Sequence, residues 1–556
     1  MKRVVPVFLA LALCLGLLLA PAAAGNPNFN ETGFPIVNEK VTYNFVAPHN
    51  TAVEDYYTNT FVTMYEDMTN VHIEWELIPP AEGRAEKLAL IFNSNVLPDA
   101  FFGCGISSMQ ATRYGDEGLF LAVEDLMDKY NPHLQVMYDN MPDIRTLMFN
   151  PDGHIYAYPS VSQCYHCSYP HKFYINAKWL DTLGLQMPTT TDELYEVLKA
   201  FKEQDPNGNG IADEIPMSAA ASSWSSWPVE WIMNAFIYDI NDQHINVEDG
   251  VVMFSPTDGR YKEGLKFLNK LFAEQLLDNE CFVMDMSMLE SKMRSGEVAT
   301  VGAAPCMHYL GLLGIEGERP YEYDSLPPIT GPAGYKSSFW DPYGLDKSKF
   351  IISTDAENPE ILARWIDWFY TEEGLLAQKY GVENQEWFHP DPASGAMGHG
   401  EGLEPGPSRF DWMPGKSWSE TVQNVTLNQQ GPIYETRAFR GAWTADPVGS
   451  PLEPNLIKHT KPYEGTELPE FYTGLIANTV AEVEELAPLR EQLNRYVNEM
   501  NAAFISGQAD IEDGWENYQQ ELRNMGVERY VEIHQAAYER FLIAGGTAIN
   551  IEGSSN

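Results

Sequence analysis

One stretch near the beginning of the chain switches repeatedly between two periodicities, and this limits the possible fold more than any other feature of the sequence. Apolar residues alternate over 41–45 and again over 71–77, which predicts two half-buried strands. Residues 54–68 carry apolar side chains at helical spacing, 81–95 predict another helix, and 98–103 predict a short buried strand. This β-α-β-α-β order predicts an α/β fold with a parallel sheet wrapped by helices.

The predicted sheet also indicates where a ligand would lie. In such sheets ligands bind at the carboxyl ends of the strands, so we expect residues 99–105 near a cleft and take Asp99 as a candidate binding residue. A second unit is predicted to begin around 155–161. Thr190, followed three residues later by Glu193, has the pattern of a capped helix start. Three further helices are predicted at the end of the chain, over 480–504, 514–526 and 527–544.

Residues 1–24 have the three parts of an export signal. Lys2-Arg3 gives a positive start, residues 4–20 form an almost unbroken apolar run, and small residues at 22–25 suit a cleavage site. A membrane-spanning anchor is disfavoured because the run is at the short end of what crosses a bilayer. We expect a secreted or extracytoplasmic protein, at the cell surface or in the periplasm, whose residues 25–40 form a tether.

The charge balance excludes one class of partner. The 556-residue chain carries 35 Lys and Arg against 79 Asp and Glu, a net charge of −44. Such a surface repels phosphate backbones, and no basic patch interrupts it, so no nucleic-acid partner is expected. The length suits two or three domains, and we expect a monomer.

The cysteines leave several possibilities open. One of the six lies in the predicted signal, and the remaining five are too few for a scaffold built from disulfides. Cys164 and Cys167 form a Cys-Tyr-His-Cys motif that suits a disulfide, a redox pair or half of a zinc site. Zinc would need further ligands, which His154, His166 and His171 offer only loosely. We therefore favour a disulfide or free thiols over zinc.

The sharpest local pattern is an oxygen-rich loop at 205–216. Side-chain oxygens at its positions 1, 3, 5 and 9, a backbone carbonyl at 7 and glycine at 6 have the spacing of a calcium-chelating loop. Position 12 is Pro216 rather than the usual glutamate, so Glu214 would have to replace it. The alternative is an Asn/Gly-rich turn without a metal. The candidate ligands of a structural Ca²⁺ are Asp205, Asn207, Asn209, Ile211 through its carbonyl, Asp213 and Glu214.

Several large aromatic residues lie in predicted loops. Sugars pack their apolar C–H faces on aromatic rings, so loop aromatics suit carbohydrate binding. Replacing Trp340 by alanine is accordingly expected to weaken ligand binding and to leave the melting temperature nearly unchanged. Trp365 and Trp368, in a helix predicted over 359–371, are instead expected in the core. The predicted stacking residues are Trp224, Trp227, Trp340, Tyr343 and Trp387.

Familiar catalytic patterns are absent from the sequence. It contains no G-x-S-x-G, no H-E-x-x-H, no phosphate-binding P-loop and no Rossmann glycine pattern. A glycosidase pair of carboxylates could be hidden among the many acidic residues, because the fold sets the separation of such a pair. We expect a binding protein rather than an enzyme, with no catalytic residues.

Several ordered motifs resemble those of a known family. The chain is similar to the extracellular solute-binding proteins of ABC importers, family 1, and most of all to the large branch that includes alginate-oligosaccharide binders. The matching segments are Leu97-Pro98-Asp99, 179–185, 188–194, the loop 205–216, 358–360, 365–373, 380–383, 504–507, 513–515 and 525–526.

The resemblance implies a periplasmic-binding-protein-like fold of two α/β lobes that close on a ligand by hinge motion. It also implies calcium at the 205–214 loop, an oligosaccharide or similar small solute in the cleft, and ABC permease subunits as partners. We assign 41–157 plus about 302–348 to the N-terminal lobe, and 158–301 plus about 349–556 to the C-terminal lobe. The alternatives are a binder of peptides or another solute with this fold, and a secreted carbohydrate-active enzyme.

Overall fold

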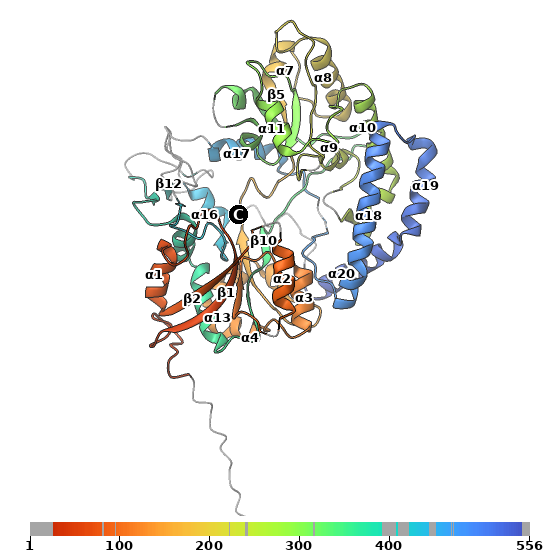
Figure 1. Ribbon diagram of the computed structural model, residues 1–556. Helices are drawn as coiled ribbons and strands as arrows, with labels where there is room; N and C mark the ends of the chain where they lie inside the picture. The colour runs from red at the N-terminus through yellow and green to blue at the C-terminus, as the bar shows by residue number, and fades with distance from the viewer. Residues whose placement is uncertain are drawn as a thin grey trace, which may run out of the picture.

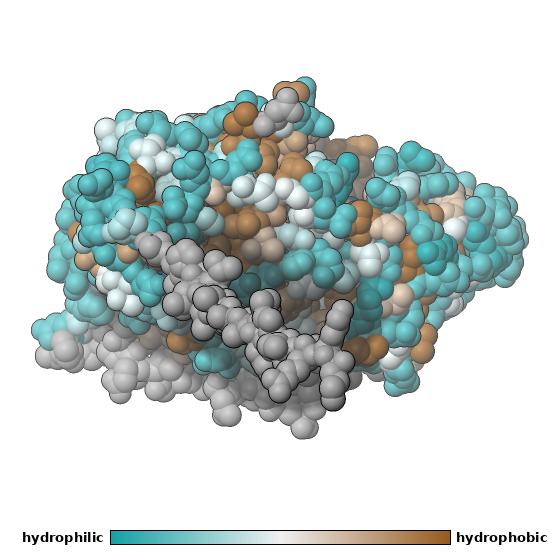
Figure 2. Space-filling model, turned by 90° about the horizontal axis from the view of Figure 1, so that it is seen from below, coloured by the Kyte–Doolittle hydropathy of each residue, from teal (hydrophilic) through white to brown (hydrophobic). Residues whose placement is uncertain are grey.

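The computed structural model shows two lobes, one above the other in Figure 1, with a group of long helices along one side. No helix within the described ranges is both long enough and apolar enough to cross a bilayer. The face shown in Figure 2 is largely hydrophilic, with smaller groups of hydrophobic residues between, in keeping with the acidic composition. The structure describes residues 26–80, 83–94, 96–221, 223–239, 243–314, 317–391, 398, 407–409, 422–443, 452–468, 470 and 472–546.

A six-stranded mixed sheet forms the first lobe, in the order β13-β4-β10-β3-β1-β2. Strand β1 runs parallel to β2 and β3, as the alternating periodicities predict, whereas β10 runs antiparallel to β3 and β4. The strands are β1 (Val41–Pro48), β2 (Val71–Ile78), β3 (Ala100–Phe102), β4 (Tyr158–Ser162), β10 (Leu345–Ile352) and β13 (Tyr434–Glu435).

Helices cover both faces of this sheet, and aromatic rings fill the core. Phe45 of β1 packs edge-on against Trp365, which is buried as predicted. Helix α1 begins at Thr60 rather than near Glu54, because the Asn59 side chain accepts a hydrogen bond from the Val62 N–H and caps the helix there. The helices of this lobe are α1 (Thr60–Thr69), α2 (Arg84–Phe92), α3 (Ser108–Asp116), α4 (Glu124–Tyr130), α5 (Pro132–Asn140), α6 (Pro142–Met148), α13 (Pro359–Asp367) and α14 (Glu372–Leu375).

The segment predicted as a tether, 25–40, is folded against the first lobe over its described part, 26–40. Ile36 and Val37 are fully buried, and the Ile36 N–H donates to the Thr69 carbonyl. Arg364 of α13 donates to the carbonyls of Glu31 and Gly33. The Asn/Pro/Gly-rich segment 26–40 is therefore an ordered loop, and the prediction of a tether is wrong for these residues.

The second lobe is built on a smaller antiparallel sheet in the order β8-β5-β9, with a separate hairpin of β6 and β7. Thr190 caps α8 as predicted, since its hydroxyl accepts from the Glu193 N–H at 3.1 Å. The elements are β5 (Lys172–Asn176), β6 (Ile245–Glu248), β7 (Val251–Phe254), β8 (Ala303–Cys306), β9 (Tyr323–Leu326), α7 (Ala177–Leu183), α8 (Thr191–Glu203), α9 (Pro228–Ile232), α10 (Gly259–Ala273), α11 (Met286–Arg294), α12 (Tyr309–Leu313) and α17 (Leu452–Thr460).

The strand pairing corrects the predicted division of the chain between the lobes. Strands β8 and β9, from the segment 302–348 assigned to the N-terminal lobe, pair with β5 of the second lobe. Strand β10 and helix α13 instead belong to the first lobe. Most residues of these two elements lie beyond 349, in the part of the chain that was predicted to form the C-terminal lobe. Antiparallel partners are set by tertiary structure, so local sequence did not reveal them.

The chain ends in three helices, confirmed close to their predicted bounds: α18 (Val480–Ser506), α19 (Ile511–Asn524) and α20 (Val527–Ile543). Helix α18 packs mainly on α10 of the second lobe and also touches α3 of the first. Figure 1 shows these helices beside the two lobes. The C-terminal helices therefore reach both lobes.

Candidate functional site

The two lobes are joined by chain segments that lie together between them. The first, 163–171, links β4 to β5, and the second, 327–344, links β9 to β10. The Asp341 N–H donates to the Ser168 carbonyl at 2.8 Å, which ties the two segments together. Ser338 is in turn hydrogen-bonded to Thr466, from a later part of the chain. These crossing segments are the region where a ligand held between the lobes would lie.

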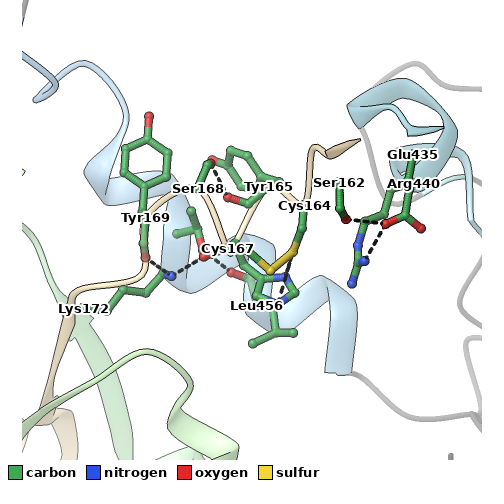
Figure 3. The surroundings of a disulfide bond; sticks show 12 residues. Ser162, Cys164, Tyr165, Cys167, Ser168, Tyr169, Lys172, Glu435, Arg440 and Leu456 are labelled. Carbon is green, nitrogen blue, oxygen red and sulfur yellow. Dashed lines mark hydrogen bonds and ion pairs between the residues drawn. A yellow bond between two sulfur atoms is a disulfide. The ribbon is translucent and has the colours of Figure 1, made fainter. Parts of the chain in front are cut away.

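The Cys-Tyr-His-Cys motif lies in the first crossing segment, and its two cysteines form a disulfide (Figure 3). His166 lies against the Cys164 sulfur. The buried Lys172 ammonium donates to the carbonyls of His166 and Tyr169, at 2.7 and 2.5 Å, and Figure 3 shows Lys172 beside Tyr169. Burial lowers the pKa of Lys172 to about 7.

The structure distinguishes between the interpretations of the Cys-Tyr-His-Cys motif. The ligand atoms of Cys164, His166 and Cys167 lie within 4.8 Å of one another, but the two sulfurs are bonded to each other. The other two proposed zinc ligands lie elsewhere, with His154 on Glu124 and His171 on Glu230. Cys164 and Cys167 form a disulfide in this structure, which was one of the two favoured interpretations, the other being free thiols.

Replacing both Cys164 and Cys167 by serine is expected to lower the free energy of unfolding by about 2 kcal/mol, the value that loop-closure entropy gives for so short a ring. Urea denaturation of the two proteins measures the difference. A reducing agent should lower the stability of the wild type by a similar amount and leave the double variant unchanged. Equal stability of the two proteins under oxidising conditions would contradict the prediction.

A second group of side chains gathers around His171, the last residue of the first crossing segment. The imidazole is only 6% exposed, and the rings of Trp224 and Phe339 approach it edge-on, with centroids 5.7 and 5.1 Å away. Its Nδ1 lies 3.1 Å from the Glu230 Oε2 on α9. Trp224 is 63% exposed, so one large ring remains open to solvent beside a buried polar pair.

The predicted stacking residues have different surroundings in the structure. Trp224 is exposed and Trp227 is half-buried against Phe282, with ring centroids 5.3 Å apart. Trp340, Tyr343 and Trp387 are buried, contrary to the expectation that they are open to a ligand. The loops that carry them are packed into the protein. Since the Trp340 ring belongs to the core, its replacement by alanine should lower stability, which corrects the expectation of an unchanged melting temperature.

Asp99 lies at the opposite end of its strand from the predicted ligand edge. It precedes β3, and its Oδ2 accepts a hydrogen bond from the Asn44 N–H of β1 at 2.7 Å. The carboxylate therefore connects two strands at the amino end of β3. A cavity of about 550 Å³ beside α2 is lined by Leu97 and Pro98, next to this aspartate.

The sequence did not indicate that His171, Glu230 or Phe339 would lie where a bound solute could contact them. The three come from the first crossing segment, from α9 and from the second crossing segment, and meet only in the folded chain. No local spacing could have revealed them. The solvent-exposed Trp224 beside them was the one member that loop position identified.

The calcium-like loop has the orphaned oxygen atoms that a cation site would have. The Asp205 Oδ1 and the Glu214 Oε1 are buried and have no hydrogen-bond partner within the described part of the chain. Burial raises the pKa of Glu214, and the nearby carboxylates Asp205 and Asp213 raise it further. Asn207 and Asn209 donate to the Asp213 carboxylate, each at 3.1 Å. These residues fit a hard cation, which would neutralise the converging carboxylates.

Comparison with known proteins gives one family and several similar structures. Residues 50–375 match the family model described as bacterial extracellular solute-binding protein. The fructooligosaccharide ABC transporter substrate-binding protein FusA of Streptococcus pneumoniae serotype 4 is 30% identical over 544 residues, covering 93% of this chain and 94% of its own.

Solved structures agree over nearly the whole length. FusA in complex with kestose has a TM-score of 0.72 at 28% identity, covering 90% of this chain and 100% of the other; an EF-hand mutant of FusA in complex with fructo-nystose gives the same values. An HMO-binding, ABC-transporter-associated solute-binding protein from Bifidobacterium longum infantis has a TM-score of 0.75 at 22% identity, covering 90% and 99%. The last likeness shows the two-lobed fold alone.

Proposed function

Because this chain belongs to the bacterial extracellular solute-binding proteins, we propose that it captures an oligosaccharide outside the cytoplasm and delivers it to the permease of an ABC importer. Two lobes joined by crossing segments suit a receptor that closes around its ligand by hinge motion. The permease would then recognise the closed form, because ligand shifts the population toward it. The relative that covers most of the chain carries fructooligosaccharide in its name, which makes short fructans the first candidate ligands.

One observation supports a sugar over other solutes. At the crossing segments an exposed indole, Trp224, lies beside the buried polar pair of His171 and Glu230. A sugar ring needs both an aromatic face for its C–H groups and fixed polar atoms for its hydroxyls.

We further propose that the protein acts on its ligand only by binding, without catalysis. The family consists of substrate-binding proteins, and the FusA relative is named for binding. A glycosidase would hold one carboxyl protonated beside an ionised one across the sugar. Glu230 instead faces the His171 imidazole, 3.1 Å away, rather than a second carboxylate.

Calcium belongs to the same proposal. Asp205, Asp213 and Glu214 would hold the ion, with the amide oxygens of Asn207 and Asn209 and the Ile211 carbonyl able to complete the set. The ion would supply a positive charge that offsets three converging carboxylates. One similar structure is that of a FusA variant described as an EF-hand mutant, which supports a metal-binding loop in that relative. In this chain the ion would be structural, since the loop follows α8, away from the crossing segments.

The purified protein is expected to bind one oligosaccharide per chain and to release it unchanged. Kestose, nystose, neutral glucans and a set of short peptides would be titrated by calorimetry, and recovered ligand examined by chromatography. A ligand at 100 times its Kd should stabilise the protein by about 2.7 kcal/mol, seen as a higher melting temperature. Cleavage of the sugar, or binding of peptides with no binding of any carbohydrate, would overturn the proposal.

A further inference from the structure

We propose that Trp224, His171 and Glu230 form a subsite for one neutral sugar ring, and that the Glu230 carboxylate rejects sugars that carry a uronate. This inference rests on the proposed function and specifies the substrate class of the same site. It makes Glu230 a specificity-determining residue. Neither the sequence pattern nor the similarity to known proteins assigned a role to Glu230, and the sequence offered His171 only as a loose zinc ligand.

Trp224 supplies the apolar wall of the subsite. Its side chain is 63% exposed, although an isolated indole of this size usually gains by being buried. One edge of the ring system meets the buried His171 imidazole, which fixes the position of the indole without covering both of its faces. A pyranose or furanose ring can therefore pack its C–H face on the indole. Phe339 is half-buried and also packs against His171, which extends this apolar surface.

The polar wall comes from Glu230 and His171. Their facing atoms are 3.1 Å apart, yet neither the Glu230 Oε2 nor the His171 Nδ1 makes a hydrogen bond of good geometry to any residue the structure describes. The Glu230 side chain keeps 25% of its surface exposed. The Glu230 Oε2 and the His171 Nδ1 are buried, so a sugar hydroxyl would donate to the exposed part of the Glu230 carboxylate.

Four cations near the crossing segments have partners of their own. Lys172 donates to two backbone carbonyls, and both Lys379 and Arg440 bind the Glu435 carboxylate. The Arg437 guanidinium lies over the Tyr165 ring, 4.7 Å from its centroid. None of these contacts turns a positive charge toward Glu230.

Acidic groups reinforce the selection. The Glu467 carboxylate accepts a hydrogen bond from the Tyr169 hydroxyl in the same crossing region, and its Oε2 is buried without a partner within the described residues. A uronate placed on Trp224 would bring a second carboxylate close to Glu230. Like charges brought together in a partly desolvated site disfavour binding strongly. The subsite should therefore accept neutral oligosaccharides and reject oligogalacturonates.

The test compares one neutral and one acidic probe on three proteins. A calorimetric panel of kestose, nystose, maltotriose, cellotriose and xylotriose identifies the tightest neutral ligand, and trigalacturonate is the acidic probe. The wild type should bind the neutral ligand at least 100-fold more tightly than trigalacturonate. Trp224→Ala and Glu230→Gln should each raise the Kd of the neutral ligand by at least 10-fold. Glu230→Gln should also reduce the ratio of the trigalacturonate Kd to the neutral-ligand Kd.

Matched controls separate the subsite from general effects. Tyr321→Ala removes an aromatic ring that is 62% exposed, and Glu297→Gln removes an exposed carboxylate, both in the second lobe away from the crossing segments. Both should bind like the wild type. The inference is overturned if trigalacturonate binds as tightly as the neutral sugars, or if the Trp224 and Glu230 variants stay within twofold of wild type. Failure of every carbohydrate to bind the wild type would overturn the proposed function as well.

Discussion

Replacing Glu435 by alanine is expected to lower the free energy of unfolding by about 3–5 kcal/mol, because it leaves a buried cation without its partner. The Glu435 side chain is fully buried, and its two oxygens lie 2.9 and 2.8 Å from the Lys379 ammonium, which is itself only 4% exposed. Arg440, the Tyr380 hydroxyl and the Ser162 hydroxyl also donate to this carboxylate, and Figure 3 shows two of these partners.

The Glu435 network lies directly beside the first crossing segment between the lobes. Glu435 lies on β13, which pairs with β4 at Val161 and Ser162, directly before the first crossing segment. The network therefore anchors one end of the first crossing segment to the sheet of the first lobe. Urea denaturation followed by circular dichroism measures the change in stability. A Glu435→Leu/Lys379→Met variant, which removes both buried charges, should recover more than half of it, and a loss below 1 kcal/mol in the single variant would contradict the prediction.

The same network sets the direction of an acid response. Burial alone would raise the pKa of Glu435, but Lys379 and Arg440 outweigh it and hold this pKa well below its usual range. The contribution of Glu435 to stability is thus complete above the unfolded-state pKa, about 4.3, and is lost as the pH falls below that value. The doubly substituted variant should lose less stability than the wild type between about pH 4 and pH 2.

The parts of the fold that could be predicted are those written in local sequence. The alternation of apolar residues along β1 and β2, and the cap at Thr190, act over a few residues and were confirmed. The calcium-like loop could be recognised because all of its candidate ligands lie within ten residues, between Asp205 and Glu214. Its geometry then revealed the buried oxygens, which no sequence pattern contains.

The parts that could not be predicted depend on tertiary partners. Whether a loop tryptophan is open or buried depends on what packs over it: Trp224 is exposed and Trp387 is buried, although both follow turn-forming residues. Strand β10 joins the first lobe through antiparallel pairing to strands more than 180 residues earlier in the chain. The subsite around His171 has the same origin, since Glu230 and Phe339 reach it from distant segments.

Removal of calcium is expected to lower the stability of the wild-type protein by about 3–4 kcal/mol when the ion had been present at several hundred times its Kd. The loop is tied to the second lobe at its end, where the Ile215 N–H donates to the Thr300 carbonyl and Ile215 forms a bridge with Val301. Without the ion, the negative charges of Asp205 and Glu214 repel each other. The buried Asp205 Oδ1 and Glu214 Oε1 have no hydrogen-bond donor among the described residues. Thermal unfolding with calcium, and with EGTA in its place, measures the difference.

A single substitution separates the ion from general effects of the chelator. Glu214→Gln removes one converging charge, so this variant should lose most of the calcium-dependent gain and, in EGTA, should be at least as stable as the wild type in EGTA. Glu196→Gln, an exposed carboxylate on α8, should respond to calcium like the wild type. Magnesium should restore little, because it demands a smaller, near-octahedral set of ligands. An identical response to EGTA in the wild type and in Glu214→Gln would show that this loop does not hold the ion.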